Sequence, residues 1–541
     1  MQKLTLVLLL LLSFLTPRAQ SVARPKLVVG IVVDQMRWDY LYRFYDRYTA
    51  TGGFKRMLNQ GFTCENTFIP YAPTVTACGH ASIYTGSVPA INGITGNFWY
   101  DNMAGKAVYC TEDSTVTTVG SSTLAGLQSP RNLFVNTIGD EMRLASNFKG
   151  KVIGVAMKDR GSILPAGHSA NGAYWYDAKT GDWITSTFYM SDLPKWVKDV
   201  NAKKLPDEYY KTGWNTLYPK DTYVQSTADE NNYESKPFGA DAKGFPYNFS
   251  KFVGTNYGVL TSTPYGNSFT TEMAKAAVTN EQLGSDAITD LLAVSFSSTD
   301  YVGHAFGPNS IEAEDIYLRL DKELGDLLDF LDSKVGKDQY TVFLSADHGA
   351  AHVPQFVKDK KMPGGVIDPN TLLENLNTAL KDKFNKTGMV AELSNYQVVL
   401  NTRAIESTKV NVKELKEFIV NYLMKQPGIA RAFDMENIQT TPLEPTIRKM
   451  INNGYFPNRC GQIQVIFQPQ YIEGFAAGGT THGLWNPYDS HIPLLFYGWG
   501  IKQGKTNRTT YMTDIAATLA ALLHIQMPNG CVGEPIQEVM K

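Results

Sequence analysis

The chain has 541 residues and a formal net charge of −2, and 43% of its residues are hydrophobic. This length exceeds what one compact core of ordinary size needs, and the apolar content excludes a disordered chain. The nearly balanced charge gives no indication of wholesale binding to nucleic acid or to an anionic membrane. We therefore expect one large folded α/β domain with insertions. We also expect a monomer that acts on small molecules.

The N-terminus has the pattern of an export signal. Lys3 supplies a positive charge, the apolar segment 4–15 follows, and Ala19-Gln20 is a plausible cleavage site. The apolar segment is shorter than the roughly 20 residues that a membrane-spanning helix needs. We expect residues 1–20 to be a signal peptide, no stable membrane insertion, and a periplasmic or secreted protein. An uncleaved anchor is the alternative.

Helical patterns and apolar runs alternate in the first part of the chain. The expected elements are a strand over 26–33, helices over 38–48 and 53–59, a helix over 132–146 and a strand over 151–157. This alternation indicates a mostly parallel sheet. Residues from about 170 to 262 break the pattern and are rich in Tyr, Trp, Asn, Lys and Gly. We interpret them as an insertion that forms a cap or lid over the sheet edge.

The alternation returns further along the chain. The expected elements are a helix over 268–281, a strand over 291–296, a helix over 310–335 and a strand over 340–344. A second insertion, 354–474, contains helices over 369–384 and 412–424 and strands over 397–400 and 462–467, and it looks like a small α+β subdomain. A strand over 491–497 and a helix over 513–523 complete the pattern. Residues 21–541 are thus expected to form one catalytic domain.

The cysteine pattern leaves two possibilities open. No CxxC pair occurs, which argues against a thiolate zinc site. In an oxidising compartment up to two disulfides could form, or all the thiols could stay reduced and buried. The sequence gives no pairing for Cys64, Cys78, Cys110, Cys460 and Cys531.

Acids follow the ends of three predicted strands, and histidines accompany them. Ligand sites in open α/β sheets form at the carboxyl ends of the strands. Asp300 and His304 are four residues apart, so one helical turn would place both on one face. Imidazole and carboxylate ligands favour zinc, with manganese or iron also compatible. The set that could hold two metal ions is Asp34, Asp300, His304, Asp347, His348 and His482. The alternative for any one of the acids is an ordinary helix N-cap.

Several hydroxyl side chains follow Pro73, just before and within a predicted helix. A hydroxyl at a helix N-terminus can meet a phosphate held by the backbone N–H groups and the helix dipole. Coordination to a metal would lower the pKa of such a hydroxyl and make it nucleophilic. On pattern alone the candidates are Thr74, Thr76, Ser82 and Thr85. A Thr N-cap without chemistry is the alternative.

The segment 73–76, Pro-Thr-Val-Thr, followed by Gly86 and by Ile-Asn-Gly-Ile at 91–94, resembles the nucleophile segment of the alkaline phosphatase superfamily. It is especially similar to nucleotide pyrophosphatase/phosphodiesterases and to PafA-type alkaline phosphatases with a Thr nucleophile. The resemblance implies an α/β/α sandwich with a central, mostly parallel sheet and ligands for two zinc ions at the six positions given above. It also implies Thr76 as the nucleophile and as a further metal ligand, and Asn97 as a contact of a phosphate oxygen.

Lys158 and Arg160, which follow the predicted strand 151–157, bear on the substrate class. PafA-type enzymes carry a Lys and an Arg two residues apart here, and both contact the transferred phosphoryl group. A monoester dianion presents one more charged oxygen than a diester. The point charge of a Lys ammonium group and the planar guanidinium group of Arg suit that additional oxygen. A solvated surface pair is the alternative.

The resemblance therefore implies a zinc-dependent alkaline phosphomonoesterase that hydrolyses diverse phosphate monoesters through a covalent threonyl-phosphate intermediate. A phosphodiesterase or nucleotide pyrophosphatase of the same superfamily is the alternative. An exported binding protein with structural metals is a third hypothesis. A purely structural metal site would have no need for the nucleophile and phosphate clamp that Thr76, Asn97, Lys158 and Arg160 would form.

Overall fold

The structure is a computed structural model that describes residues 22–239, 241–242, 244–474 and 478–541. The expected signal peptide, residues 1–20, lies outside the described residues. So do residues 240 and 243 of the first expected insertion and residues 475–477 in the glycine-rich stretch before His482. Within the described ranges, no helix is both long enough and apolar enough to cross a membrane.

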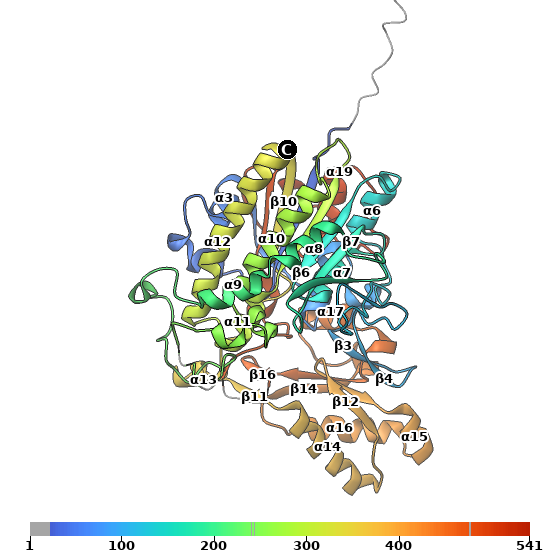
Figure 1. Cartoon of the computed structure of the whole chain (residues 1–541). Helices are drawn as coiled ribbons and strands as arrows, with labels where there is room; N and C mark the ends of the chain where they lie inside the picture. The colour runs from blue at the N-terminus through green and yellow to red at the C-terminus, as the bar shows by residue number, and fades with distance from the viewer. Residues whose placement is uncertain (1–21, 240, 243, 475–477) are drawn as a thin grey trace, which may run out of the picture.

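A large mixed sheet of 11 strands forms the centre of the molecule (Figure 1). Its strands lie in the order β17 (His491–Ile492), β2 (Phe62–Phe68), β18 (Leu494–Gly498), β10 (Tyr340–Ser345), β1 (Leu27–Val33), β9 (Asp290–Phe296), β6 (Val152–Ala156), β7 (Gly172–Asp177), β8 (Asp182–Ser186) and β5 (Thr118–Val119), and β19 (Gly504–Tyr511) pairs with β2. The central run from β10 to β7 is parallel throughout. All residues of β10, β1, β9 and β6 are buried, as expected for parallel strands that are covered on both faces.

Helices cover the two faces of this sheet. One group consists of α3 (Gly53–Gln60), α8 (Lys195–Ala202), α10 (Tyr265–Asn280), α11 (Ser298–Phe306) and α12 (Ile311–Leu331), and the other of α4 (Thr76–Thr85), α6 (Ile138–Ala145), α7 (Asp159–Ala166) and α19 (Asp514–Leu523). Strand β7 shows the alternation that separates them. Tyr174 packs on Trp196 of the first group, whereas Trp175 packs in a cluster with Ile163 of the second. The predicted α/β/α sandwich with a mostly parallel sheet is confirmed.

Three predicted elements are wrong in detail, and two of them have a clear local reason. The segment 38–48 contains two short pieces, α2 (Tyr40–Arg43) and the 3-10 turn η1 (Tyr45–Arg47), instead of one helix. The helix predicted over 132–146 starts only at Ile138, because Thr137 caps it: the Thr137 hydroxyl accepts from the N–H of Asp140 and the Asp140 carboxylate accepts from that of Thr137. The strand predicted over 491–497 is divided into β17 and β18 at Pro493, which has no N–H to donate.

The first expected insertion begins later than the sequence pattern indicated. Strands β7 and β8 extend the central sheet, so residues 172–186 belong to the main fold and not to a cap. The rest contains α8, α9 (Leu205–Thr212) and the 3-10 turns η2 (Lys220–Thr222), η3 (Ser250–Phe252) and η4 (Tyr257–Ser262). Its aromatic side chains are packed and not loose: Trp214 is fully buried and donates to the Asp315 carboxylate of α12 at 2.7 Å.

The second expected insertion has its own sheet and its own core. Its strands β12 (Val390–Ser394), β13 (Gln397–Leu400), β15 (Ile463–Phe467) and β14 (Ile429–Asp434) form an antiparallel sheet in that order, and β11 (Gly365–Ile367) pairs with β16 (Tyr471–Glu473). Its helices are α13 (Pro354–Asp359), α14 (Pro369–Phe384), α15 (Thr402–Thr408), α16 (Val412–Leu423) and α17 (Pro445–Gly454). Leu376, Leu415 and Phe467 belong to a hydrophobic cluster separate from that of the central sheet. Figure 1 shows β12, α14, α15 and α16 of this part projecting below the main body.

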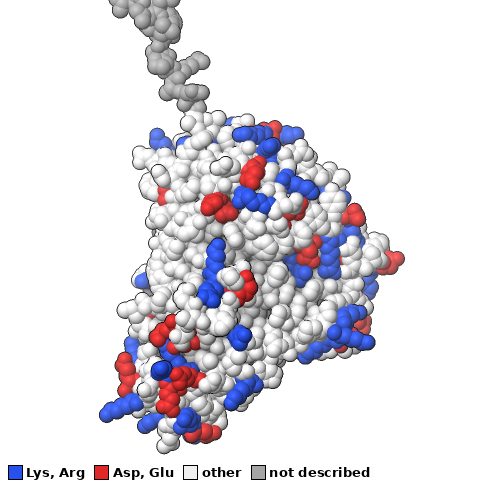
Figure 2. Space-filling view, turned by 180° about the vertical axis from the view of Figure 1, so that it is seen from behind, with Lys and Arg blue, Asp and Glu red and all other residues white. Residues whose placement is uncertain are grey.

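Short elements complete the fold. They are α5 (Pro89–Asn92), the hairpin β3 (Phe98–Asp101) with β4 (Lys106–Tyr109), α18 (Pro487–Ser490), the π-helical turn η5 (Asp332–Gly336) after α12, and the 3-10 turns η6 (Met435–Asn437), η7 (Pro457–Arg459) and η8 (Gln537–Val539). All five cysteines are free thiols, and four of them are buried. Figure 2 shows basic and acidic side chains interspersed on the rear face, in keeping with the net charge of −2.

Candidate active site

The first group of ligand-type side chains lies where the neighbouring strands β1 and β10 end. Asp34, Asp347 and His348 are buried there, and one ligand atom from each lies within 4.8 Å of the other two. The Nε2 atom of His348 is 3.6 Å from Asp34 Oδ1 and 3.4 Å from Asp347 Oδ2. Its Nδ1 atom is 3.0 Å from the carbonyl oxygen of Gly349, which directs Nε2 toward the carboxylates.

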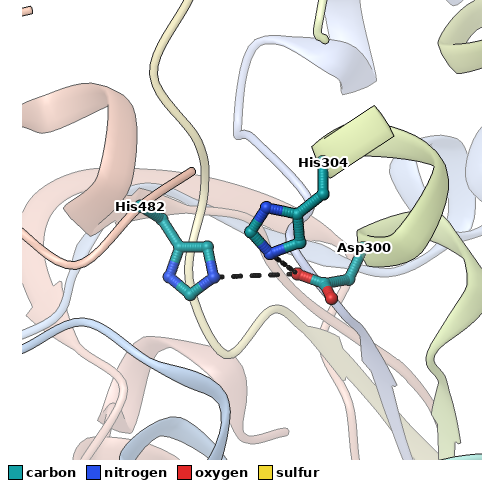
Figure 3. Close-up of side chains that lie close together, drawn as sticks. All are labelled: Asp300, His304 and His482. Carbon is teal, nitrogen blue, oxygen red and sulfur yellow. Dashed lines mark ion pairs between the residues drawn. The ribbon is translucent and has the colours of Figure 1, made fainter. Parts of the chain in front are cut away.

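The second group joins one helix to a distant segment. Asp300 and His304 lie one turn apart on α11, and His482 comes from the loop before α18 (Figure 3). Asp300 Oδ1 is 3.2 Å from His304 Nε2 and 3.7 Å from His482 Nε2. The rings of His482 and His348 stack with centroids 3.5 Å apart, so the two groups adjoin. The structure thus brings together the six residues that the sequence indicated.

The donor atoms of both groups fit metal ions. The Nδ1 atoms of His304 and His482 each lie 2.7 Å from a backbone carbonyl oxygen, that of Thr480 and that of Thr74. A carbonyl oxygen at Nδ1 accepts the ring proton, so Nε2 keeps a lone pair for a metal ion. Such a carbonyl is the usual outer contact of a metal-binding histidine. Asp34 Oδ1 and Asp347 Oδ2 are buried and have no hydrogen-bond partner within the described part of the chain. Two unpartnered carboxylate oxygens beside an Nε2 atom are what a cation would satisfy.

The electrostatics of the imidazoles favour the neutral form at two positions. Burial lowers the pKa of His482 well below its usual value, and the neighbouring His348 and His304 lower it further. Burial also lowers the pKa of His348, against the attraction of Asp347. Neutral imidazole is the form that coordinates a metal. Both groups therefore contain a histidine in the state that ligation needs.

Lys158 connects the two groups. Its ammonium nitrogen is 2.8 Å from Asp34 Oδ2 and 2.6 Å from Asp300 Oδ2, and the side chain is buried. Burial opposes the charged form, but the Asp300 and Asp34 carboxylates raise the pKa of Lys158 above its usual value. Lys158 is therefore a fixed positive charge at the centre of the site and not a solvated surface residue.

Thr76 is the hydroxyl that the fold places beside the first group and Lys158. It is the first residue of α4, and its Oγ1 atom is 3.4 Å from His348 Nε2 and 3.4 Å from Lys158 Nζ. The other threonine candidates are committed elsewhere: Thr74 donates to the carbonyl of Leu484 and Thr85 to that of Ala81. The geometry therefore favours Thr76 among the threonines as the reactive hydroxyl.

The side chains of Asn97 and Arg160 are held by different contacts. Asn97 Oδ1 accepts from the N–H of Ala77 at 2.9 Å, which holds the amide against the first turn of α4 and leaves its NH₂ group as a donor. Arg160, on the first turn of α7, is partly buried, with 17% of its side chain exposed, and donates to the hydroxyl of Tyr109 at 3.0 Å. That hydroxyl donates to Asp159, so Asp159 points into this network and not away from it.

Two further residues contact the site that the sequence did not single out. Gln35 donates from its backbone N–H to Asp347 Oδ1 at 3.0 Å and from its side chain to Asp300 Oδ1 at 2.7 Å, and so bridges both groups. His80 lies with Nδ1 2.9 Å from the carbonyl oxygen of Thr76 and 3.4 Å from Asp347 Oδ2. The sequence did contain a signal for each residue in its position. Gln35 directly follows Asp34, and His80 comes one helical turn after Thr76.

The chain is similar in sequence to known proteins along most of its length. The model of the family "Type I phosphodiesterase / nucleotide pyrophosphatase" matches residues 28–485. The chain is 54% identical to the alkaline phosphatase PhoV of Synechococcus elongatus over 96% of this chain and 94% of that protein. It is 54% identical to a protein of Myroides odoratus named calcium-transporting ATPase, over 98% and 97% of the two chains. It is 49% identical to the alkaline phosphatase PafA of Elizabethkingia meningoseptica, over 97% and 96%.

Solved structures show the same fold. The crystal structure of wild-type alkaline phosphatase PafA superposes with a TM-score of 0.94 at 49% identity, covering 96% of this chain and all of that one. Murine ectonucleotide pyrophosphatase/phosphodiesterase 5 matches with a TM-score of 0.50 at 16% identity, a likeness of fold alone.

Proposed function

The chain belongs to the type I phosphodiesterase/nucleotide pyrophosphatase family, and we propose that it is a zinc-dependent alkaline phosphomonoesterase that works through a covalent threonyl-phosphate. The observation that carries this proposal is the position of Thr76 Oγ1, 3.4 Å from both His348 Nε2 and Lys158 Nζ at the start of α4. A hydroxyl placed beside a ligand group and a buried ammonium group at a helix N-terminus suits attack on a bound phosphoryl group.

Asp34, Asp347 and His348 would hold one zinc ion, and Asp300, His304 and His482 the other. When bound, two such ions supply Lewis-acid stabilisation to the oxygens that enter and leave in an in-line displacement. The unpartnered oxygens of Asp34 and Asp347 support this assignment.

The residues of the chain divide the reaction into two displacements. In the first, Thr76 Oγ1 loses its proton and forms a bond to phosphorus, the bond from phosphorus to the ester oxygen breaks, and the leaving alcohol takes up one proton, so that no net proton is released. In the second, the oxygen of water forms a bond to phosphorus, the bond to Thr76 Oγ1 breaks, one proton of the water restores the Thr76 hydroxyl, and inorganic phosphate leaves with the other. The positive N-terminal end of α4 and the NH₂ group of Asn97 would stabilise the negative charge on the phosphoryl oxygens.

Lys158 and Arg160 support a monoester as the substrate. Lys158 is buried and Arg160 is partly buried, and the doubly charged phosphoryl group of a monoester makes better use of two cations than the singly charged group of a diester. The relatives named alkaline phosphatase support the same substrate class. Hydrolysis of ATP also transfers a terminal phosphoryl group to water, with a diphosphate in place of an alcohol as the leaving group, so the relative named as an ATPase fits the proposal as well.

A phosphodiesterase is the second candidate, favoured by the description of the family itself. In that function the position of Arg160 would have to accommodate a second ester group. We also propose that the enzyme acts on small phosphate esters outside the cytoplasm, on the strength of the export pattern in residues 1–20.

The test compares hydrolysis of a phosphate monoester and its methyl diester by the purified, zinc-loaded enzyme and by Arg160→Ala. We predict that the wild type prefers the monoester and that Arg160→Ala lowers kcat/KM for the monoester about 10–100-fold with a much smaller loss for the diester, because a hydrogen bond to a charged oxygen is lost. Arg431→Ala, at an exposed position of β14, is the control. A faster diester reaction, or an equal loss on both esters, would assign the chain to the diesterases.

A further inference from the structure

A two-residue turn of the second insertion lies against the active site. Strands β12 and β13 pair antiparallel with Ser394 opposite Gln397, which leaves Asn395 and Tyr396 as the turn. Both have positive φ, 50° and 61°, as in type I′ hairpin turns. Asn is common at such positions and Gly usually follows it, whereas a bulky side chain in this region is an outlier. A tyrosine at a position that favours glycine points to a role for its side chain.

Asn395 contacts the segment that carries Asn97. Its side-chain NH₂ group donates to the carbonyl oxygen of Phe98 at 2.7 Å, and the same side chain fills the space beside Gly96, where an added Cβ atom would lie 2.5 Å from it. Gly96 and Phe98 flank Asn97, whose amide holds the first turn of α4 through Ala77. Asn395 therefore fixes the backbone on both sides of the proposed phosphate contact.

Tyr396 contacts the segment that carries His482. Its hydroxyl donates to the carbonyl oxygen of His482 at 3.0 Å, and its ring lies against Gly483. Tyr396 is in turn anchored in the second insertion: its carbonyl oxygen accepts from the N–H of Val465 at 2.8 Å, and its ring packs on Phe467 with centroids 5.1 Å apart. A rigid donor thus holds the backbone from which the His482 imidazole projects.

We propose that Asn395 and Tyr396 are positioning residues, through which the second insertion holds Asn97 and His482 in place from a single turn. The inference rests on the proposed function, because it assigns the two contacts to phosphate binding and to metal retention. Two side chains, adjacent in sequence, thereby control two different properties of the site. A merely structural turn would change both properties together or neither.

Tyr396→Phe tests the metal contact in the full-length enzyme. The variant keeps the ring and removes only the hydroxyl, and we expect the chelator concentration that removes half of the bound zinc to fall about tenfold, as for loss of an outer contact of a ligand. Zinc content is measured directly, so the result does not depend on turnover. Tyr422→Phe, on α16 of the same insertion, is the matched control and should retain zinc like the wild type.

Asn395→Gly tests the phosphate contact. Glycine suits the positive φ, so the turn survives while the donor to Phe98 is lost. We expect the inhibition constant for inorganic phosphate to rise about threefold to tenfold with zinc retention unchanged. Asn385→Gly, at the left-handed C-cap of α14, is the matched control.

The inference is overturned if Tyr396→Phe retains zinc as Tyr422→Phe does, if Asn395→Gly binds phosphate as Asn385→Gly does, or if each variant alters both properties alike. A wild-type enzyme that hydrolyses no monoester would instead refute the proposed function, while the zinc measurement on Tyr396→Phe would still decide the role of the turn.

Discussion

At the scale of single residues, the buried charge of the site is unbalanced. The carboxylates of Asp34, Asp300 and Asp347 face one ammonium group, that of Lys158, and all four side chains are buried. Burial, reinforced by repulsion from Asp347, raises the pKa of Asp34 well above its usual value. Buried carboxylates without full compensation are costly, so bound cations would relieve the site and stabilise the fold around it.

Tyr109 determines how Arg160 is oriented, and this leads to a prediction. Burial, and then the Asp159 carboxylate, raise the pKa of Tyr109, so its phenol stays protonated between Asp159 and Arg160. We expect Tyr109→Phe to lower the preference for a monoester over its methyl diester about threefold to tenfold, the effect of one lost hydrogen bond. Ratios of kcat/KM measure it, with Tyr100→Phe in the same hairpin as the control. An unchanged ratio would show that Tyr109 does not orient Arg160.

At the scale of elements, caps and prolines decide the boundaries that periodicity misses. The helix over 369–384 was predicted correctly because its N-cap aspartate, its proline and its apolar spacing agree. Helix α6 was predicted too long because the apolar residues before Thr137 continue the helical spacing although the capping box starts the helix. Strands β7 and β8 were taken for an irregular insertion, because strands buried on both faces and rich in aromatic residues show no alternation of apolar and polar residues.

The cap of α6 predicts a dependence of stability on pH. Burial raises the pKa of Asp140, but hydrogen bonds from His168, Thr137 and Ser169 outweigh it and lower the pKa to about 2. A carboxyl group whose pKa is lower in the folded state stabilises the fold above its unfolded pKa of about 3.9, and that stabilisation is lost as the pH falls toward 2.

The test is the melting temperature of the wild type and of Asp140→Asn from pH 7 down to pH 3. The variant cannot ionise, so we expect the wild type to be more stable by about 2 kcal/mol at neutral pH and the difference to shrink below about pH 4. A difference that stays constant over this range would mean that the carboxylate charge does not stabilise the cap.

At the scale of the whole molecule, the candidate site was largely predictable because strand ends converge. Three acids at the ends of β1, β9 and β10 had to meet, since these strands are parallel neighbours. The contacts of Asn395 and Tyr396 were not predictable, because no local pattern relates a hairpin turn to segments about Phe98 and His482 that are far away in the sequence. The same holds for Tyr109, whose role depends on where the β3–β4 hairpin docks.

The most direct test of the account is the identity of the residue that takes the phosphoryl group. The zinc-loaded enzyme is mixed with an excess of a phosphate monoester, quenched in acid and digested, and its peptides are analysed by mass spectrometry. We predict one phosphoryl group on the peptide that contains Thr76, located on that threonine, and none in Thr76→Ala, which should also lose hydrolysis by a factor of at least about 10³. A phosphoryl group on another residue, or full hydrolysis by Thr76→Ala, would contradict the account.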